Sequence, residues 1–454
     1  MSAAPADTLM VSVSGVRGIV GKDLTPELVA RYAAAFGTLV RNGERPSAVV
    51  LARDARVSGP MFAAAAAAGL VSVGCRVIDA GLIPTPTAQL AVEHHGAGGG
   101  LVITASHNPI EWNALKFVGA DGLFLDQPAA ERLQALLAGT LPRAGWDGLG
   151  DTARDDGAVQ RHLARVLALP HVDVARIRAR GFTVALDCVR GAGGTIMPAL
   201  LEALGCTVTA IHTETDGRFP RAPEPIPAHL GELSALVRRT GADLGIAVDP
   251  DVDRLALVDG TGAPIGEDYT LAFAVEAVLR RRAGPVVVNL STSLVVDDVA
   301  GAYGVTVARA PVGEANVARA MRRAGAVVGG EGNGGVMLPA LHLGRDAPLA
   351  AALVLDLLAA TGDAVHDRVA ARPRYTIVKA KAPRGADLDA AYGALIARFP
   401  DAATDRQDGL RLAWADRWLH VRPSGTEPIV RFIAEARTPD AAEALVAAAG
   451  DLVA

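Results

Sequence analysis

The sequence predicts an α/β protein with three related mixed α/β domains, each with a parallel-rich sheet, followed by a C-terminal α+β domain. Two observations predict this fold class. Residues 47–81, 182–213 and 284–313 repeat one pattern of strand, turn, helix and strand. After about residue 370 the strands and helices no longer alternate in this way.

Each repeated segment begins with a short strand rich in β-branched residues and continues with a polar or Gly-rich turn. A stretch of helical period comes next, then a glycine and a second strand, as in "FTVALDCVRGAGGTIMPALLEALGCTVTAIHT" at 182–213. This order predicts parallel strands joined by crossover helices. One large sheet that reuses the same unit is the alternative, but a chain of 454 residues exceeds what a single core usually serves.

The C-terminal region comes after a helical stretch, "DAPLAAALVLDLLAATGD". It contains a helix-like "DLDAAYGALIARF", strand-like "LRLAWADRWLHVRPS" and "VRFIAEA", and an Ala-rich helix from Pro439. Length and pattern together predict domains at residues 1–150, 151–256, 257–368 and 369–454.

Composition and charge argue against several classes of function. The formal net charge is −5 with acids and bases mixed along the chain, so no basic stripe indicates a nucleic-acid partner. The scattered cysteines, Cys75, Cys188 and Cys206, argue against a disulfide framework and for a reducing compartment. The N-terminal residues lack the pattern of a secretion signal, and "MFAAAAAAGLVSVG" is too short to span a membrane. We therefore expect a cytoplasmic protein with neither a nucleic-acid nor a membrane partner.

The first of four polar loops ends the apolar strand in "LVITASHNPIEWNALKF", residues 101–117. Ser106 lies at the predicted end of that strand, where open α/β sheets bind ligands, so its hydroxyl is a candidate nucleophile. His107 and Lys116 are candidate proton donors and positive charges for such a reaction. An ordinary polar turn is the alternative, because Ser-x-Asn-Pro is common turn chemistry.

The second loop, in "GIAVDPDVDRLALVD", places Asp249, Asp251 and Asp253 directly after a predicted strand. In a loop these carboxylates can converge on one cation, and a site without His or Cys selects a hard ion such as Mg²⁺. Without a cation, acids this close repel one another and are driven partly neutral. A capped, solvated turn is the alternative, while an EF-hand is excluded because its Gly and Glu positions are not filled.

The third loop, "VVGGEGNGGVM" at residues 327–337, sets Glu331 and Asn333 among glycines. Glycines let the backbone approach a ligand closely, and a carboxylate beside an amide suits neighbouring sugar hydroxyls. The pattern is not G-x-G-x-x-G, so a dinucleotide site is weakly supported. A plain Gly-rich turn is the alternative.

The fourth loop, "HVRPSGTEPIVRF" at residues 420–432, is dense in groups that donate hydrogen bonds to anions. Two guanidiniums, two hydroxyls and a glycine amide can surround a phosphate, although the loop lacks the ending of a P-loop. A surface turn between strands is the alternative. The candidate phosphate-binding residues are Arg422, Ser424, Gly425, Thr426 and Arg431.

In this order and at these separations, the four loops resemble those of the α-D-phosphohexomutase family. The segment "SVSGVRGIVGKDLTPE" adds a fifth match, and the resemblance covers essentially the whole chain. It implies four domains in a heart shape around a central cleft, which carry in order a phosphoserine loop, a metal loop, a sugar-recognition loop and a phosphate-binding loop. The segments "DGRFPRAPEPIPAHLGEL", "DPDVDR" and "GGEGNGGV" are most similar to the bacterial and archaeal branch that acts on glucosamine phosphates.

The resemblance also implies roles for individual residues. It implies a phosphoserine at Ser106 and one Mg²⁺ per chain, bound by Ser106, Asp249, Asp251 and Asp253. Arg17 and Lys116 are expected to lie near the transferring phosphoryl group. Lys116, with a pKa lowered by burial near other cations, is a candidate acid or base, and Arg17 and His107 are the alternatives for that role. Sugar and phosphate binding would fall to Arg254, Glu331, Asn333, Arg422, Ser424, Gly425, Thr426 and Arg431.

The sequence departs from the family's commonest pattern in two loops. Pro250 and Val252 fill the gaps in the metal loop, where glycine and alanine are common. Asn333 and Gly335 stand where serine and histidine are common in the sugar loop. The first departure preserves the acids, whereas the second leaves the choice of sugar open.

The expected activity is the interconversion of glucosamine 6-phosphate and glucosamine 1-phosphate through a phosphoserine and a hexosamine 1,6-bisphosphate intermediate. A hexose 1,6-bisphosphate would be the activator, hexose or hexosamine phosphates the small-molecule partners, and the protein a monomer or homodimer. The alternatives are a mutase for glucose or mannose phosphates, a metal-dependent phosphatase that uses the same residues, and a non-catalytic sugar-phosphate binding protein.

Overall fold

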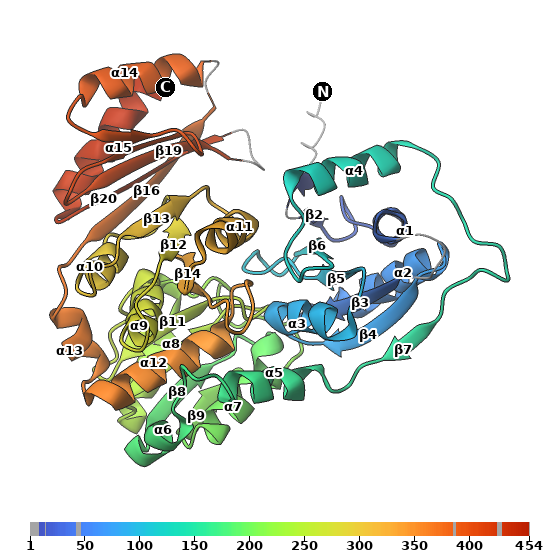
Figure 1. Ribbon diagram of the computed structural model, residues 1–454, viewed down its shortest axis with the longest axis horizontal. Coiled ribbons are helices and arrows are strands. Elements are labelled where there is room, and N and C mark those ends of the chain that lie inside the picture. The colour runs from blue at the N-terminus through green and yellow to red at the C-terminus, as the bar shows by residue number, and fades with distance from the viewer. Residues whose placement is uncertain (1–8, 14, 42–46, 385–386, 425–428, 454) are drawn as a thin grey trace.

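The computed structural model describes residues 9–13, 15–41, 47–384, 387–424 and 429–453. Across these residues the strands form four sheets, of seven, four, four and five strands in chain order (Figure 1). The first sheet and its helices lie on the right of Figure 1, the second sheet lies at the bottom, and the third lies between it and the fourth at the upper left. The repeated segments fall in separate sheets, so the predicted α/β class is confirmed and the single-sheet alternative is wrong.

The first sheet has the order β1-β2-β6-β5-β3-β4-β7. Strands β5, β3, β4 and β7 are parallel to their neighbours in this group. Strands β1, β2, β6 and β5 pair antiparallel, each with the next. The strands are β1 (Met10–Ser12), β2 (Gly15–Ile19), β3 (Ala48–Arg53), β4 (Arg76–Leu82), β5 (Gly99–Ile103), β6 (Trp112–Gly119) and β7 (Thr152–Arg154). The helices are α1 (Pro26–Val40), α2 (Gly59–Val71), α3 (Thr85–His95) and α4 (Gln127–Ala138).

Small residues explain how the Ala-rich helix α2 packs. A Cβ atom at Gly69 would lie 2.3 Å from the carbonyl oxygen of Ala30, so α1 and α2 approach closely only because this position is glycine. The apolar stretch that raised the question of a membrane segment is therefore a helix packed on its neighbour. Among the described residues, no helix has both the length and the apolar character needed to cross a membrane.

The second sheet has the order β11-β10-β8-β9, with β8 parallel to β9 and β10, and β11 antiparallel to β10. Its strands are β8 (Thr183–Asp187), β9 (Thr207–Ile211), β10 (Leu244–Val248) and β11 (Leu255–Asp259). The accompanying helices are α5 (Ala158–Leu167), α6 (Val174–Arg180), α7 (Met197–Ala203) and α8 (Gly231–Thr240), with 3₁₀ turns at Ala192–Thr195 and Pro227–His229.

Two of the expected domain boundaries fall at places where the chain continues in the preceding sheet. Strand β7 begins after the boundary at residue 150 but pairs with β4 of the first sheet. The boundary at residue 256 lies inside β11, which returns antiparallel along β10. Both strands are short additions at a sheet edge, and neither belongs to the repeated βαβ unit on which the boundaries were based.

The third sheet has the order β13-β12-β14-β15. Its strands are β12 (Val286–Asn289), β13 (Val307–Ala310), β14 (Val328–Glu331) and β15 (Gly335–Met337). Its helices are α9 (Asp268–Leu279), α10 (Val295–Gly301), α11 (Glu314–Ala324), α12 (Ala347–Thr361) and α13 (Val365–Ala370). Helix α12 is buried from Ala347 to Leu358 and is apolar there except for Asp356, and one continuous apolar core joins the second and third sheets around it. These two units are therefore packed as one block.

The fourth sheet is antiparallel throughout, in the order β16-β20-β19-β18-β17, and has its own core. Its strands are β16 (Thr376–Pro383), β17 (Ala403–Asp405), β18 (Leu410–Ala413), β19 (Trp418–Pro423) and β20 (Ile429–Ala436), with α14 (Leu388–Arg398) and α15 (Pro439–Val453) on it. The predicted α+β character of the C-terminal region is confirmed.

Polar side chains join the fourth sheet to the third. Glu435 on β20 accepts hydrogen bonds from the Trp418 indole (2.7 Å) and from the backbone N–H of Leu294 at the start of α10 (2.8 Å). His420 on β19 lies 2.8 Å from the hydroxyl of Ser291. The strands that lead into the phosphate-binding loop are thus fixed against the third unit.

Candidate active site

The serine loop starts where β5 ends and is held in an uncommon backbone conformation. Ser106 has a φ of 48°, in the left-handed region that residues with side chains seldom adopt. Its N–H donates to the Thr104 hydroxyl (2.9 Å), which in turn donates to the Asp54 carboxylate (2.7 Å). Its own hydroxyl donates to Asp249 at 2.8 Å. The candidate nucleophile therefore reaches the aspartate cluster of the second unit.

The buried guanidinium of Arg56, which the sequence reasoning missed, holds the backbone of this loop. Arg56 donates hydrogen bonds to the carbonyl oxygens of Ser106 and Asn108, both at 2.7 Å. It also donates to the carbonyl oxygens of residues 109 and 112 and pairs with Asp54. A strained φ persists only where the surroundings over-determine it, and these contacts do so. An Asp-x-Arg directly after strand β3 was the available signal.

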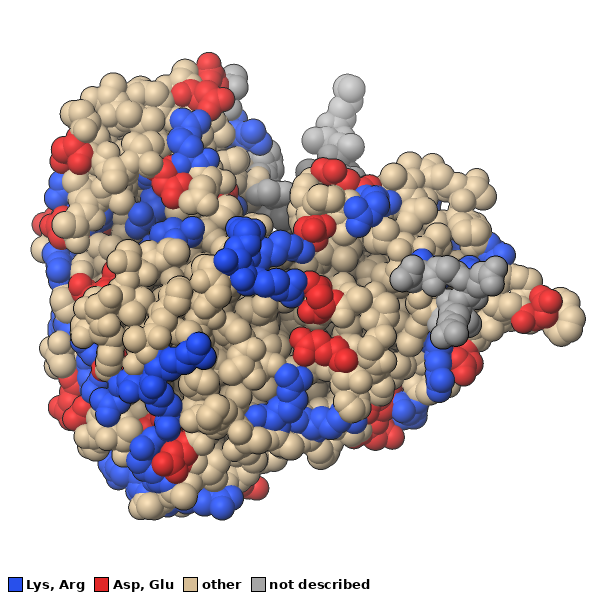
Figure 2. Space-filling model, viewed as in Figure 1, with Lys and Arg blue, Asp and Glu red and all other residues tan. Residues whose placement is uncertain are grey.

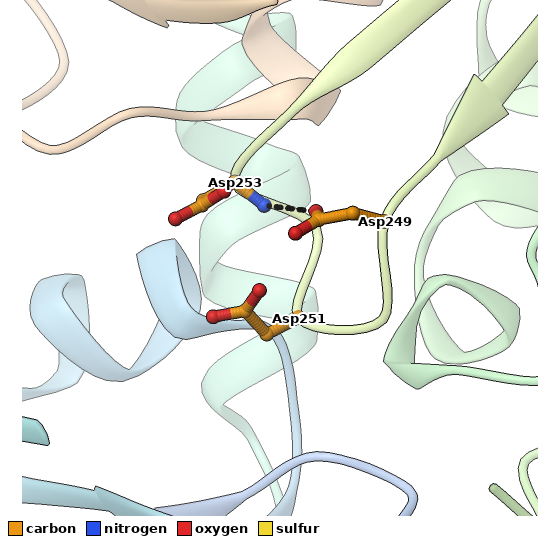
Figure 3. A group of neighbouring side chains, drawn as sticks. All are labelled: Asp249, Asp251 and Asp253. Carbon is orange, nitrogen blue, oxygen red and sulfur yellow. Dashed lines mark hydrogen bonds between the residues drawn. The ribbon is translucent and has the colours of Figure 1, made fainter. Parts of the chain in front are cut away.

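The metal loop is the tight turn between β10 and β11. Asp249, Asp251 and Asp253 lie close together in Figure 3, and each offers a carboxylate oxygen within 4.8 Å of those of the other two. Asp249 accepts hydrogen bonds from the backbone N–H groups of Asp253 (3.1 Å) and Arg254 (3.2 Å). Val252 has a φ of 65°, so this turn is also tightly constrained. The structure brings the three acids together, as the sequence indicated.

The donor set of this loop fits a hard divalent cation such as Mg²⁺. All three aspartates are fully buried, and Asp251 Oδ1 and Asp253 Oδ1 have no hydrogen-bond partner in the described part of the chain. Buried, unsatisfied carboxylate oxygens are costly unless a cation binds them. Burial and the two neighbouring carboxylates raise the pKa of Asp249 well above its usual value. A bound cation would offset this repulsion between neighbouring carboxylates.

Lys116 lies on β6 with its ammonium among these acids. It donates to Asp251 Oδ2 at 2.7 Å and lies 3.8 Å from Asp253 Oδ2. Burial lowers the pKa of Lys116, but the two carboxylates outweigh this and raise it above the usual value. The expectation of a lowered pKa is therefore wrong, because the nearest charges are acids rather than cations.

His107 follows Ser106 in the serine loop, and Arg17 and Arg254 lie near it from other elements. Arg17 on β2 donates to the side-chain oxygen of Asn108 (3.1 Å), and Arg254 pairs with Glu224 (3.1 Å). His107 Nδ1 lies 3.3 Å from Ser106 Oγ. The positive charge of Arg254, together with burial and Arg17, lowers the pKa of His107 well below its usual value, so its imidazole is neutral.

The sugar-recognition loop joins β14 to β15. Glu331 is buried and accepts hydrogen bonds from the Asn289 amide (2.9 Å) and the Gly313 N–H (2.8 Å). Its second oxygen accepts from Arg345 at 2.7 Å. Asn333 accepts from the N–H of Gly335 (3.3 Å), which holds its amide at the cavity wall. Arg345, ten residues after Gly335, is a second residue that the sequence reasoning missed.

The phosphate-binding loop begins at the end of β19. Arg422, Ser424 and Arg431 line the cavity, and Arg422 pairs with Asp408 at 2.9 Å. Gly425 and Thr426 lie outside the described residues. Asp408 also accepts from the backbone N–H of Val312, so it links this loop to the segment beside Glu331.

Most of these side chains line one cavity of about 1190 Å³. It is lined by residues of all four units, with Arg254 from the second, and opens where Figure 2 shows the face hollowed between the two upper lobes. Ser106 is at its wall, and the aspartate cluster lies buried behind the serine. Its lining includes the predicted residues Arg17, Ser106, His107, Lys116, Arg254, Glu331, Asn333, Arg422, Ser424 and Arg431.

Known proteins share the order of the four units. Four family models match in order, each described as phosphoglucomutase/phosphomannomutase: domain I at residues 9–142, domain II at 160–262, domain III at 266–375 and the C-terminal domain at 377–451. A phosphoglucomutase/phosphomannomutase of Thermococcus kodakarensis is 38% identical over 94% of each chain. A probable phosphoglucosamine mutase of Methanopyrus kandleri is 37% identical over 95% of each chain.

A solved structure shows the same fold. The crystal structure of a phosphoglucomutase/phosphomannomutase family protein from Burkholderia thailandensis superimposes with a TM-score of 0.83 at 27% identity, over 98% of this chain and 97% of that one. These matches span all four units and the loops that line the cavity. The chain belongs to the α-D-phosphohexomutase family, a class of isomerases that move a phosphoryl group on a hexose.

Proposed function

We propose that this protein is a phosphoglucosamine mutase, which interconverts glucosamine 6-phosphate and glucosamine 1-phosphate. The observation that carries the phosphoryl-transfer chemistry is the 2.8 Å contact between Ser106 Oγ and Asp249, at the wall of a cavity that the candidate sugar and phosphate loops also line. This contact supports the proposal because it brings the proposed nucleophile next to the proposed cation ligands and the proposed substrate pocket. The choice of glucosamine phosphates is supported by the relative at 37% identity that is named a probable phosphoglucosamine mutase.

Ser106 Oγ is proposed to carry the transferable phosphoryl group. A sugar hydroxyl oxygen attacks the phosphorus, the bond to Oγ breaks as the new P–O bond forms, and a hexosamine 1,6-bisphosphate results. The intermediate then turns round, and its other phosphoryl group returns to Oγ, which restores the enzyme. A bound Mg²⁺ would supply positive charge to the phosphoryl oxygens, with Asp249, Asp251 and Asp253 as its ligands.

The geometry supports different roles for the two candidate acid–base groups. His107 is neutral and lies 3.3 Å from Ser106 Oγ, so it is proposed to accept the proton of the attacking hydroxyl and return it in the second half. Lys116 is positively charged beside two acids and is proposed to stabilise charge on the transferring group. Near-normal turnover of His107→Gln would remove the first role, and near-normal turnover of Lys116→Met the second.

The remaining site residues are proposed to bind the two ends of the substrate. Glu331 and Asn333 would contact sugar hydroxyls. Arg17 and Arg254 would lie against the transferring phosphate, and Arg422, Ser424, Gly425, Thr426 and Arg431 would bind the other one. Guanidiniums bind phosphate in bidentate fashion, which suits a loop that must accept either end of the intermediate.

A mutase for glucose or mannose phosphates is the second candidate, because one relative at 38% identity carries that name. A coupled assay with Mg²⁺ and a trace of hexose 1,6-bisphosphate tests both. Fastest turnover of glucosamine 6-phosphate supports the first candidate, and fastest turnover of glucose or mannose 1-phosphate supports the second. No turnover of any hexose phosphate would refute both, and release of inorganic phosphate in step with substrate loss would indicate a phosphatase.

A further inference from the structure

A single guanidinium lies between three buried carboxylates from three different segments. Arg345 Nε donates to Glu314 Oε2 (3.1 Å) and Nη1 donates to Glu331 Oε2 (2.7 Å). Nη2 donates to Asp253 Oδ2. Glu314 begins α11, Glu331 ends β14 and Asp253 belongs to the metal loop. Arg345 is 8% exposed, so little water competes for these contacts.

Arg345 occupies only one oxygen of each carboxylate and leaves the other for a different partner. On Asp253 the remaining oxygen, Oδ1, is the one without a hydrogen-bond partner among the described residues. On Glu331 the remaining oxygen accepts from Asn289 and Gly313. The planar guanidinium therefore fixes the orientation of an acid of the cation site and an acid of the sugar-recognition loop at the same time.

The backbone next to Arg345 is itself held. The next residue, Asp346, caps helix α12 by accepting from the N–H of Leu349 (2.8 Å), and its own N–H donates to the carbonyl oxygen of Val336 on β15 (2.9 Å). The N–H of Ala347 donates to the carbonyl oxygen of Val252 in the metal loop (3.2 Å). Arg345 is thus anchored beside the two loops whose acids it binds.

We propose that Arg345 is a positioning residue for both halves of the site, so that one side chain sets both the affinity for the divalent cation and the affinity for the sugar phosphate. The inference rests on the proposed function for the roles of Asp253 and Glu331. Groups that hold metal-ligating carboxylates typically change metal affinity by about 10–100-fold when they are lost. Binding through Glu331, which the same guanidinium fixes, is expected to weaken in parallel.

Lysine cannot replace arginine here, although it keeps the charge. A lysine ammonium places its donors on one nitrogen, whereas Arg345 reaches three carboxylates from three nitrogens. Arg345→Lys therefore keeps the positive charge and removes the geometry that lets one side chain contact three carboxylates. Glu314→Gln is the milder companion variant, because Glu314 contacts Arg345 and Gln89 and does not itself belong to the metal loop or the sugar-recognition loop.

The test measures two equilibria in the purified full chain: Mn²⁺ binding by paramagnetic resonance without sugar, and binding of glucose 6-phosphate and glucosamine 6-phosphate by calorimetry. Arg345→Lys is expected to weaken Mn²⁺ binding at least about 10-fold and sugar-phosphate binding in the same direction. Glu314→Gln is expected to weaken both by a smaller factor. Arg368→Lys is the matched control, since Arg368 is a largely buried arginine paired with Glu276 and Asp363 away from the cavity.

The inference is overturned if Arg345→Lys changes only one of the two affinities, or if Arg368→Lys changes both as much. Should Arg345→Lys fail to fold by circular dichroism, Glu314→Gln decides by the same criterion. Failure of the proposed function would appear in the unaltered protein as no binding of either hexose phosphate, which would also overturn the sugar half of this inference. Failure of the inference alone would appear only in the variants.

Discussion

Replacing Arg56 with lysine tests how the serine loop is held. The guanidinium donates hydrogen bonds to the carbonyl oxygens of residues 106, 108, 109 and 112 at 2.7, 2.7, 2.7 and 2.8 Å, and its side chain is 1% exposed. A lysine has fewer donors and none in a fork, so we expect Arg56→Lys to lose about two of these bonds. At about 1.5–3 kcal/mol for each hydrogen bond to a charged group, the loop would lose ~3–6 kcal/mol.

Hydrogen exchange measured by mass spectrometry detects this loss where it occurs. Since ~1.4 kcal/mol corresponds to a tenfold change in an equilibrium constant, local opening of residues 104–113 should increase about 100-fold or more. Exchange in β16–β20, which have a separate core, should not change. Arg53→Lys is the control, because Arg53 makes one 3.2 Å bond to the Asp54 carbonyl oxygen nearby. If loop exchange stays within about twofold of the unaltered protein, or rises equally in both variants, Arg56 does not hold the loop.

Further predictions concern the cavity and the acid side of stability. Glu331→Gln should raise the KM for sugar phosphates more than it lowers kcat, because it removes one charge from the pocket. If Glu331 acts on the chemical step instead, steady-state kinetics would show a larger change in kcat than in KM. Arg422→Ala should weaken sugar-phosphate binding by about 1.5–3 kcal/mol, the value of a hydrogen bond to a charged group, and calorimetry that finds no change would contradict its role. Chelation by EDTA should abolish turnover, with Mg²⁺ restoring it and Ca²⁺ restoring less, because magnesium demands a tighter octahedral site. Burial raises the pKa of Asp187, but His212 and Arg221 outweigh burial and lower that pKa below its usual value. The Asp187 carboxylate therefore stabilises the folded protein at pH values above its unfolded-state pKa. This stabilisation is lost as the pH falls through the folded-state pKa. In Asp187→Asn, the melting temperature should therefore fall less steeply as the pH is lowered. A melting temperature with the same dependence on acidic pH as in the unaltered protein would count against this prediction.

The loops were predictable because each candidate motif is local in the sequence. Ser106 and the three aspartates lie in the loops that follow β5 and β10, and loops at the strand ends of an α/β sheet are where ligands bind. The acids that share one loop lie within five residues, so their convergence needed no knowledge of the fold. The α/β class could be predicted from three repeats of one unit for the same reason.

The supporting residues were not predictable because their partners are distant in the chain. Arg345 meets Asp253 across 92 positions, and Arg56 meets Ser106 across 50. Neither arginine belongs to a motif with a known spacing. The packing of separate sheets brings Arg345 to Asp253, and the pairing of β3 with β5 within the first sheet brings Arg56 to Ser106. The pKa of Lys116 was predicted in the wrong direction for the same reason, since Asp251 lies 135 positions away.

The edge strands show a second limit of sequence reasoning. Strand β7 has only three residues, and β11 returns on β10 through the metal loop. Neither belongs to the βαβ repeat. The predicted boundaries at residues 150 and 256 therefore lie N-terminal to residues that still pair with the preceding sheet.

The position of the covalent phosphate is the decisive measurement for a phosphoserine mechanism. The purified protein is incubated with Mg²⁺ and glucose 1,6-bisphosphate, and its intact mass and peptide map are recorded, with Ser106→Ala beside it. We predict a gain of about 80 Da, one phosphoryl group, on the peptide that contains Ser106, and none in the variant. A phosphoryl group on any other residue, or an unmodified protein that nevertheless turns over hexose phosphates, would contradict the mechanism.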